Sequence, residues 1–452
     1  MSNLIKKYNV PGPRYTSYPT VPFWDELNFT RKEWINQLTN NFTLSNSTEG
    51  ISIYIHLPYC ESLCTFCGCH KYITKRHEVE QPYINAVLKE WQMYLKLFNE
   101  QPIVKELHLG GGTPTFFSSF ELNRLISGIF ENAIKHDNIE LSFEGHPNNT
   151  TKEHLVTLYD LGFNRVSFGV QDYDAKVQKA INRIQPFEKV ANVTKLAREI
   201  GYESVSHDII YGLPFQTIDT IINTVEKTAE LLPDRISFYS YAHVPWIKGN
   251  GQRGFNDEDL PKDEEKRQLY ELGRELFQKN KYQEIGMDHF ALEQDDLFKS
   301  FKNKTLHRNF MGYTPSKTTV MIGLGASSIS DCGSAFAQNE KDIKQYLNLI
   351  NAEELPVIKG HIFNEEDKIL RAAISDIICK FQTDLTTVYP IIGREEVQER
   401  LTEFSKDNLL TIQDDVLIVT ELGKTFVRNI CMAFDDYLIK SNPEKQLFSM
   451  TI

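Results

Sequence analysis

The 452-residue sequence lacks any uninterrupted apolar stretch of the roughly 18 residues that a membrane-spanning helix needs. The segment from Met1 to Lys7 also lacks the apolar core of a secretory signal peptide, so we expect a cytoplasmic protein with no membrane partner. Basic residues are in deficit, with 49 Lys and Arg against 61 Asp and Glu. A net charge of -12 provides no basic surface for a phosphate backbone, and we expect no nucleic-acid partner.

A disulfide framework is missing too, because seven cysteines is an odd number and their spacing is uneven. Four of them fall within ten residues, at Cys60, Cys64, Cys67 and Cys69. Such crowding is typical of a metal site. The other three are scattered and are predicted to be buried apolar side chains without chemistry: Cys332, Cys379 and Cys431.

From residue 51 the sequence alternates short β-rich runs with longer amphipathic segments, which predicts βα units on a parallel sheet. The predicted strands are Ile51 to Leu57, Glu106 to Leu109, Ile139 to Glu144, Arg165 to Val170, Ser204 to Ile210 and Arg235 to Tyr241. The predicted helices are Pro82 to Phe98, Phe120 to Lys135, Lys152 to Leu161, Phe187 to Ile200 and Ile218 to Leu232. Six units indicate an α/β fold with a partial (β/α)6 barrel, because the region after Tyr241 does not cleanly supply the two further units of a complete barrel.

The two ends of the chain have other patterns. Residues 1–50 carry Pro11, Gly12, Pro13 and Pro19 among tyrosines, which is typical of an extended arm able to cover a cleft. Residues 361–452 combine two helices with a β-hairpin over Leu409 to Thr420 and resemble a winged-helix domain. Because this region has ten Lys and Arg against sixteen Asp and Glu, we expect a lid or brace and not a DNA-binding module. The predicted domains are therefore the arm over 1–50, the partial barrel with an extension over 51–360 and the mainly helical domain over 361–452.

The clustered cysteines follow the first predicted strand, in the segment His56-Leu-Pro-Tyr-Cys60-Glu-Ser-Leu-Cys64-Thr-Phe-Cys67-Gly-Cys69-His70. Three thiolates at Cys60, Cys64 and Cys67 can hold a four-iron cluster and leave its fourth iron open for a ligand. A structural zinc site that also uses Cys69 or His70 is the alternative. The position after the first strand of a βα series favours the cluster, and Phe66 and Gly68 suit the flanks of an adenine. Cys69 is a spare ligand, a thiol beside the cluster that does not bind it, or an apolar neighbour without chemistry, and we favour the last two because three ligands already suffice.

Polar residues follow the other predicted strands, and in a parallel sheet they gather at one rim. Gly110-Gly-Gly-Thr-Pro-Thr115 follows the second strand, where it either exposes amide donors to a ligand or forms a tight turn. Carboxylates at a strand end suit ribose hydroxyls or an ammonium group. Each residue alone is more often a cap or a solvated turn residue, but their shared position at strand ends favours a common site. The strand-end residues are Glu144, Gln171, Asp172, Asp208, Ala242 and His243, and Arg183 is either a carboxylate partner or a surface residue.

Eight segments spread over nearly the whole chain resemble the oxygen-independent coproporphyrinogen III oxidases of the radical S-adenosylmethionine superfamily. Among them the arm and the fourth cysteine of the cluster are the specific parts. The segments are Tyr8 to Thr20, the cysteine cluster, Gly110 to Thr115, Phe168 to Asp172, Ile210 to Pro214, Gly286 to Phe290, Leu306 to Phe310 and Arg428 to Cys431.

The resemblance implies oxidative decarboxylation of two propionates of coproporphyrinogen III, giving protoporphyrinogen IX for haem synthesis through a 5'-deoxyadenosyl radical and without oxygen. It implies a 4Fe-4S cluster on Cys60, Cys64 and Cys67, with Tyr54 and Glu144 as further catalytic residues. It also implies a flavodoxin- or ferredoxin-type electron donor and a monomer. Two S-adenosylmethionine molecules are implied, of which the first contacts Tyr54, Gly111, Glu144 and Ile329. The second contacts Phe66, Gly68, Gly112, Thr113, Gln171, Arg183, Asp208 and Ala242.

The chain departs from the family pattern at one point, since it has Glu144-Gly-His146-Pro147 where the family usually reads Glu-Val-Asp-Pro. A tetracarboxylate substrate needs cations, for which Arg14, Arg183 and Arg308 are candidates. The rival function is a haem chaperone of the same superfamily, which generally lacks the proline-rich arm and the CxC ending. His243, His289 or His307 could ligate haem in such a protein, but lone histidines are more often structural.

Overall fold

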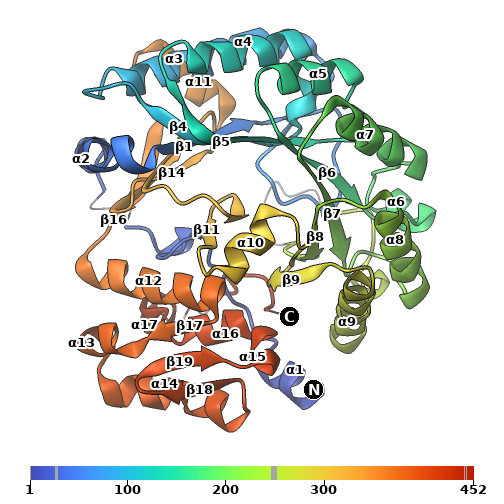
Figure 1. Cartoon of the computed structure of the whole chain (residues 1–452), viewed down its shortest axis with the longest axis vertical. Helices are drawn as coiled ribbons and strands as arrows, with labels where there is room; N and C mark the ends of the chain where they lie inside the picture. Colours follow the sequence, from blue (N-terminus) through green and yellow to red (C-terminus); the bar gives the residue numbers. More distant parts are fainter. Residues whose placement is uncertain (1, 26–28, 246–251, 442, 444, 452) are drawn as a thin grey trace.

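We describe the computed structural model of the chain over residues 2–25, 29–245, 252–441, 443 and 445–451. A twelve-stranded mixed sheet forms the curved layer in the upper half of Figure 1, in the order β16-β15-β14-β13-β1-β4-β5-β6-β7-β8-β10-β9. Its central strands pair in parallel and lie where the sequence predicts six strands. They are β1 (Ile51–Leu57), β4 (Ile103–Gly111), β5 (Ile134–Gly145), β6 (Arg165–Gln171), β7 (Ser204–Tyr211) and β8 (Arg235–Ser240).

Both edges of the sheet extend beyond the predicted units. On one side β13 (Val320–Leu324) pairs in parallel with β1, so that a strand from far along the chain becomes a neighbour of the first one. Antiparallel strands continue from it: β14 (Ile329–Asp331), β15 (Ala335–Asn339) and β16 (Val357–Ile362). On the other side β8 is followed by β10 (His289–Ala291) and β9 (Gln283–Gly286), both antiparallel. The fold is therefore α/β with a mixed sheet, and β13 and β8 are not paired with each other to close it.

Helices cover the outer side of the curved sheet, where their apolar faces bury it (Figure 1). They are α3 (Glu80–Leu95), α4 (Ser119–Phe130), α5 (Lys152–Asp160), α6 (Ala175–Ala180), α7 (Phe187–Ile200), α8 (Ile218–Leu231), α9 (Asp263–Lys279) and α11 (Ile343–Asn351). The predicted helix from Phe120 to Lys135 is too long, because α4 ends at Phe130 and Lys135 lies in β5. The inner side of the curve holds α10 (Asp296–Lys302), β11 (His307–Asn309) and β12 (Gly312–Thr314).

The prediction of an extended arm over residues 1–50 is wrong for two segments. Residues Ser2–Tyr8 form α1, and Arg31–Glu49 form the 19-residue helix α2. The side chain of Thr30 caps α2 by accepting from the backbone N–H of Glu33, and the helix buries Trp34, Leu38 and Phe42 against the sheet. These apolar residues recur at every fourth position, which is typical of a helix, and the prolines lie before this stretch and not within it.

The last region of the chain forms the lower half of Figure 1. Its three-stranded sheet β17-β19-β18 is antiparallel and includes the predicted hairpin. Its core also takes in Tyr8, Tyr15 and Tyr18 of the arm, which ties the arm to this region. The elements are α12 (Glu365–Lys380), β17 (Gln382–Asp384), α13 (Tyr389–Ile392), α14 (Arg394–Lys406), β18 (Leu410–Gln413), β19 (Val416–Val419), α15 (Glu421–Lys424), α16 (Val427–Met432) and α17 (Asp436–Ser441).

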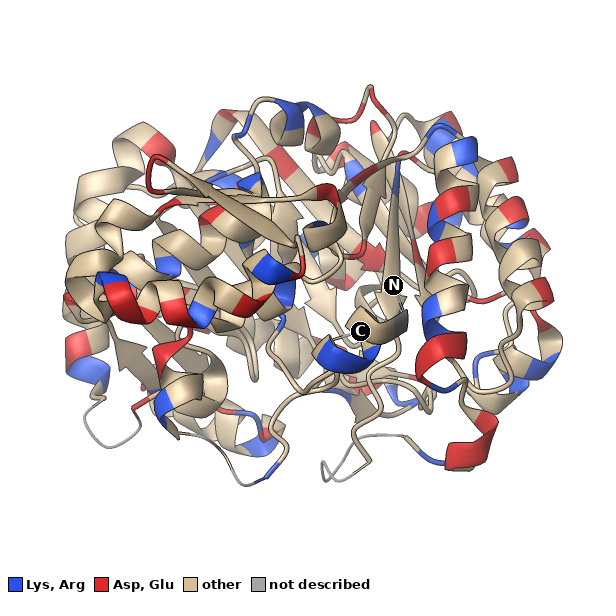
Figure 2. Cartoon of the chain, turned by 90° about the horizontal axis from the view of Figure 1, so that it is seen from below, with Lys and Arg blue, Asp and Glu red and all other residues tan. Residues whose placement is uncertain are grey.

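Both ends of the chain meet beside this region, as Figures 1 and 2 show from two directions. Pro11 and Met450 form an antiparallel bridge, and the N–H of Gly12 donates to the carbonyl of Ser449 at 3.0 Å. The buried guanidinium of Arg428 donates to four main-chain carbonyls, those of Gly12, Pro13, Met450 and Thr451. One side chain thus holds the arm and the final residues together.

Figure 2 shows Lys and Arg interspersed with Asp and Glu along the helices of the face that it displays. Among the helices of the described residues, none combines the length and the apolar character required to cross a bilayer.

Candidate active site

The loop after β1 carries the cysteine cluster, and its short strands β2 (Tyr59–Cys60) and β3 (Tyr72–Ile73) pair in parallel. All four cysteines of the loop are free thiols and line one cavity of about 280 Å³. The Sγ atom of Cys60 lies 3.3 Å from Oγ1 of Thr113, and Nη1 of Arg183 donates to Sγ of Cys64 at 3.7 Å. The fold therefore brings four cysteines and the cation of Arg183 to the walls of the same cavity.

The thiols of this cavity have different affinities for a proton. Burial raises the pKa of Cys60 to about 11. A hydrogen bond from Cys69 lowers the pKa of Cys67 to about 6, and the same contact raises the pKa of Cys69 well above its usual range. This contact therefore favours the thiolate form of Cys67 over that of Cys69, whereas burial disfavours the thiolate of Cys60.

Within the described ranges, no three His, Cys, Asp or Glu side chains converge closely enough to hold a single metal ion. A four-iron cube spaces its thiolate ligands more widely than one zinc ion does, because each thiolate binds a different iron. The arrangement of Cys60, Cys64 and Cys67 around a cavity suits the cluster better than the zinc alternative.

Residues of β6 and β7 also line this smaller cavity. Gln171 at the end of β6 has a left-handed backbone with φ 70°, and Nη2 of Arg183 donates to the carbonyl of Gly169 at 2.6 Å. Asp208 of β7 accepts from Oγ of Ser167 at 3.0 Å, and burial raises the pKa of Asp208 to about 6. Of the eight residues predicted for the second S-adenosylmethionine, six line this cavity: Phe66, Gly112, Thr113, Gln171, Arg183 and Asp208.

The other two residues of that set lie elsewhere. Gly68 lines a second, larger cavity. Ala242 lines neither cavity in the described part of the chain, but its carbonyl accepts from Nε2 of Gln252 at 2.7 Å, and Gln252 also reaches the carbonyl of Phe66 at 3.4 Å. The side chain of Gln252 therefore links Ala242 to Phe66 in the wall of the smaller cavity.

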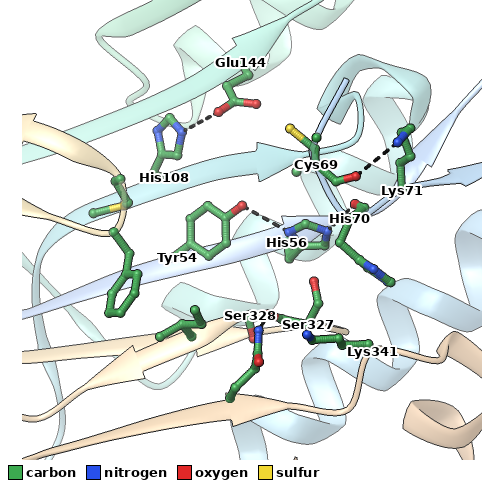
Figure 3. A pocket seen from close by; sticks show the side chains of 16 residues that line it. Tyr54, His56, Cys69, His70, Lys71, His108, Glu144, Ser327, Ser328 and Lys341 are labelled. Carbon is green, nitrogen blue, oxygen red and sulfur yellow. Dashed lines mark hydrogen bonds and ion pairs between the residues drawn. The ribbon is translucent and has the colours of Figure 1, made fainter. Parts of the chain in front are cut away.

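The larger cavity has a volume of about 740 Å³ and is lined by all four residues predicted for the first S-adenosylmethionine: Tyr54, Gly111, Glu144 and Ile329. Figure 3 shows its interior. The hydroxyl of Tyr54 lies 3.1 Å from Nδ1 of His56, and Nε2 of His108 lies 3.5 Å from Oε1 of Glu144. Burial raises the pKa of Tyr54 well above its usual range, so the phenol is neutral.

The two cavities adjoin each other. Cys69, Lys71, Gly111 and Glu144 line both of them. The ammonium group of Lys71 donates to the carbonyls of Cys67 and Cys69, at 3.2 and 3.3 Å, and Figure 3 shows the second of these contacts. Cys69, predicted to lie beside the cluster, thus stands at the boundary between the two cavities.

The glycine run forms part of this boundary, and its geometry allows no side chain. Gly111 has φ +115°, and a Cβ atom there would lie 2.8 Å from the ring of His56. The amides of Gly112 and Thr113 donate to the carbonyls of Leu57 and Tyr59, at 2.8 and 3.0 Å. The expectation that the run exposes amide donors is wrong for these two residues, because carbonyls of β1 and β2 already accept from them.

His146, the departure from the family pattern, lies in the smaller cavity near Arg183. Its Nδ1 accepts from the backbone N–H of Asn148 at 3.2 Å, which leaves the proton of the neutral ring on Nε2. Burial lowers the pKa of His146 to about 3. The side chain is therefore a neutral donor where the family usually has an acid.

Several cavity residues have no strong signal in the sequence. His56 lies two residues after Tyr54 in β1, so the two side chains are on the same face of the strand. The two-residue repeat of a strand could have predicted that His56 lines the cavity with Tyr54. Phe310 and Met311 come from the β11–β12 hairpin, and Ser327 and Ser328 from the turn between β13 and β14. Only the tertiary fold brings these segments to the site.

A buried carboxylate supports that turn. Glu90 of α3 accepts from the N–H of Gly325 at 2.8 Å, from Nδ2 of Asn339 at 2.7 Å and from the hydroxyl of Tyr346 at 2.7 Å. Burial raises the pKa of Glu90 to about 7. The wall that carries Ser327 and Ser328 therefore depends on a carboxyl group from the outer side of the sheet.

This combination of an open parallel sheet and a cysteine loop after its first strand is found in a known class of proteins. Residues 54–228 match the model of the radical SAM superfamily. The computed structure superposes on the solved coproporphyrinogen III oxidase of Escherichia coli, described as a radical SAM enzyme, with a TM-score of 0.89 and 35% identity over 96% of this chain and 98% of that one.

Relatives of known activity narrow the class to a family. The chain is 39% identical over 444 residues to the oxygen-independent coproporphyrinogen III oxidase of Helicobacter pylori, covering 96% of both. It is 36% identical to the oxygen-independent coproporphyrinogen III oxidase of Escherichia coli, over 99% of this chain and 98% of that protein. The chain belongs to the oxygen-independent coproporphyrinogen III oxidase family.

Proposed function

We propose that the chain oxidatively decarboxylates two propionate side chains of coproporphyrinogen III to vinyl groups, giving protoporphyrinogen IX for haem synthesis without oxygen. The observation that carries the proposal is the full-length relationship to oxidases of this name, at 39% identity to the Helicobacter pylori protein. A cavity lined by free cysteines that adjoins a second, larger cavity supports it.

In this proposal Cys60, Cys64 and Cys67 hold a 4Fe-4S cluster, and Arg183 beside Cys64 helps to offset the thiolate charge. When bound and reduced, this cluster would supply the one electron needed for reductive cleavage of S-adenosylmethionine. Removal of a hydrogen atom from the propionate β-carbon, loss of carbon dioxide and transfer of one electron to an acceptor would then give the vinyl group.

The two cavities provide for two S-adenosylmethionine molecules. In the smaller cavity Asp208 would accept from ribose hydroxyls and Arg183 would donate to the methionine carboxylate, beside Phe66, Gly112, Thr113 and Gln171, with Gly68 and Ala242 at its margin. In the larger cavity Glu144 would accept from an ammonium group, beside Tyr54, Gly111 and Ile329. The volume of about 740 Å³ lies within the range of roughly 300–1,000 Å³ typical of ligand sites.

The remaining proposals concern the chain as a whole. We interpret the open sheet over 51–360 as a partial (β/α)6 barrel, residues 1–50 as a cover over the site and residues 361–452 as a winged-helix-like brace. We further propose a cytoplasmic monomer that receives electrons from a flavodoxin- or ferredoxin-type donor. Sedimentation of the purified protein and reduction of the cluster by candidate donors test these points.

The test of the function is anaerobic reconstitution with iron and sulfide, followed by addition of coproporphyrinogen III, S-adenosylmethionine and a reductant. The expected products are protoporphyrinogen IX and 5'-deoxyadenosine. Cys64→Ala should abolish both products, whereas Cys332→Ala, at a buried cysteine away from the loop, should retain them. Stable haem uptake with neither product would instead favour a haem chaperone.

A further inference from the structure

Three arginines are candidate partners for the substrate carboxylates, and the structure separates them by what they already bind. Nη1 of Arg14 donates to Asp288 at 2.8 Å and Nη2 to the carbonyl of Ser240 at 3.1 Å. Arg183 is engaged with Gly169 and Cys64 beside the cysteine loop. Arg308 has no hydrogen-bond acceptor or carboxylate partner among the described residues, and its Nε and Nη1 atoms are buried.

The fold holds the Arg308 guanidinium in place without neutralising it. Arg308 is directly opposite Tyr313 in the β11–β12 hairpin, and its guanidinium carbon lies 4.6 Å from the Tyr313 ring centroid. The hydroxyl of Tyr313 donates to the carbonyl of Ile378 at 3.2 Å, which fixes the ring beneath the cation. A cation stacked in this way keeps its N–H edge available to an anion.

Arg308 also lines a small cavity of about 30 Å³ between the arm and α12. Thr16 and Ser17 of the arm and Ser375 of α12 are among its other lining residues. Arg371 lines it too but donates two hydrogen bonds to Asp331, so its charge is already paired. The cavity suits one small anionic group, because the half-buried guanidinium of Arg308 has no acceptor of its own among the described residues.

The same hairpin lines the larger cavity with Phe310 and Met311, which directly follow the strand of Arg308. We propose that Arg308 binds one propionate carboxylate of the tetracarboxylate substrate in the cavity beneath the arm. This inference rests on the proposed function. It makes Arg308 a binding residue, distinct from the residues that hold the cluster or S-adenosylmethionine, and it gives the arm a part in substrate recognition.

The test measures binding of coproporphyrin III, the fluorescent oxidised form of the substrate, to the reconstituted anaerobic enzyme by fluorescence titration. A charge-assisted hydrogen-bonded pair predicts that Arg308→Met weakens binding by about tenfold to a hundredfold. The tetra-amide of the same porphyrin lacks the carboxylates and should bind the variant and the wild type equally. Arg308→Lys should weaken binding less than Arg308→Met, because it keeps the charge but loses the planar fork.

Arg400→Lys is the control, since Arg400 lines neither the small cavity nor the two larger ones and is paired with Glu396 and Asp436. It should leave the affinity for coproporphyrin III unchanged. Without porphyrin, Arg308→Met should melt at or above the wild-type temperature, because it removes a half-buried charge that has no carboxylate partner among the described residues. A lower melting temperature for Arg308→Met, with porphyrin affinity unchanged, would show that the guanidinium has another partner and would overturn the inference.

A small inorganic anion is the other source of such a charge. If chloride raises the melting temperature of the wild type but not of Arg308→Met, and porphyrin affinity is the same in both, the cavity is a chloride site and the inference fails. Failure of the proposed function gives a different result, namely wild-type enzyme that forms no protoporphyrinogen and does not bind coproporphyrin III.

Discussion

Glu90 offers a quantitative test of how the sheet supports the site. Its carboxyl is fully buried, and burial raises its pKa from 4.5 to about 7. The unfolded chain releases this proton near pH 4.5, whereas the folded protein retains it up to about pH 7. Between these values the folded state binds more protons, so the free energy of unfolding falls as the pH rises. The shift corresponds to about 3 kcal/mol, present at low pH and lost by about pH 8.

Replacing Glu90 with Gln removes the titration and keeps the shape. At about pH 5 both side chains are neutral, and the variant should be less stable by about 1–3 kcal/mol, since its amide group faces the donors of Gly325, Asn339 and Tyr346. At about pH 8 the wild type has lost the contribution of the proton. The difference between the two proteins should therefore shrink by about 3 kcal/mol or change sign.

Anaerobic urea unfolding across this pH range measures the difference, with Glu421→Gln as the control because Glu421 is exposed on α15. A Glu90→Gln deficit that stays constant from about pH 5 to about pH 8 would refute the reasoning, because the carboxyl would then titrate alike in the folded and unfolded states.

Three further predictions concern the site. Gly111→Ala should destabilise the protein by about 1–3 kcal/mol and weaken S-adenosylmethionine binding, since φ is +115° and the new Cβ would lie 2.8 Å from His56. Calorimetric titration measures the binding, and an unchanged affinity would contradict the assignment of Gly111 to the cavity wall. Cys69→Ala should keep the iron and sulfide content of the wild type, whereas Cys67→Ala should lose it, and equal iron loss in both would make Cys69 a ligand. Since the pKa of His146 is lowered to about 3, His146→Gln should preserve the S-adenosylmethionine affinity and its dependence on pH between about 6 and 8. If the wild-type affinity changes with pH in that range and the affinity of the variant does not, His146 is protonated there and the reasoning fails.

The sequence predicted the six central strands because each is a short apolar run between turn residues and amphipathic helices. It did not reveal the place of β13, since the run Val320–Leu324 reads as a buried strand but nothing local tells which edge it joins. Helix α2 did have a signal, in Trp34, Leu38 and Phe42 at every fourth residue. The prolines upstream of this helix led to the prediction of an extended arm over the whole region.

The predicted site residues were those that side-chain chemistry and strand-end position can mark, such as the cysteines, Glu144 and Asp208. The structure places Tyr54 and Ile329 in the same cavity as Glu144, but that grouping came from resemblance and not from spacing. Phe310, Met311 and Ser327 could not be predicted, because they reach the cavity through a hairpin and a turn outside the six units. Ala242 contacts Gln252 through its backbone carbonyl, and a contact made by the backbone cannot be predicted from the type of side chain.

The guanidinium of Arg428 joins residues 12 and 13 to residues 450 and 451. Arg428 and Pro13 are 415 residues apart in the chain. Because the entropy lost in closing a loop grows with its length, we expect these hydrogen bonds to form late in folding, after the sheet and its local helices.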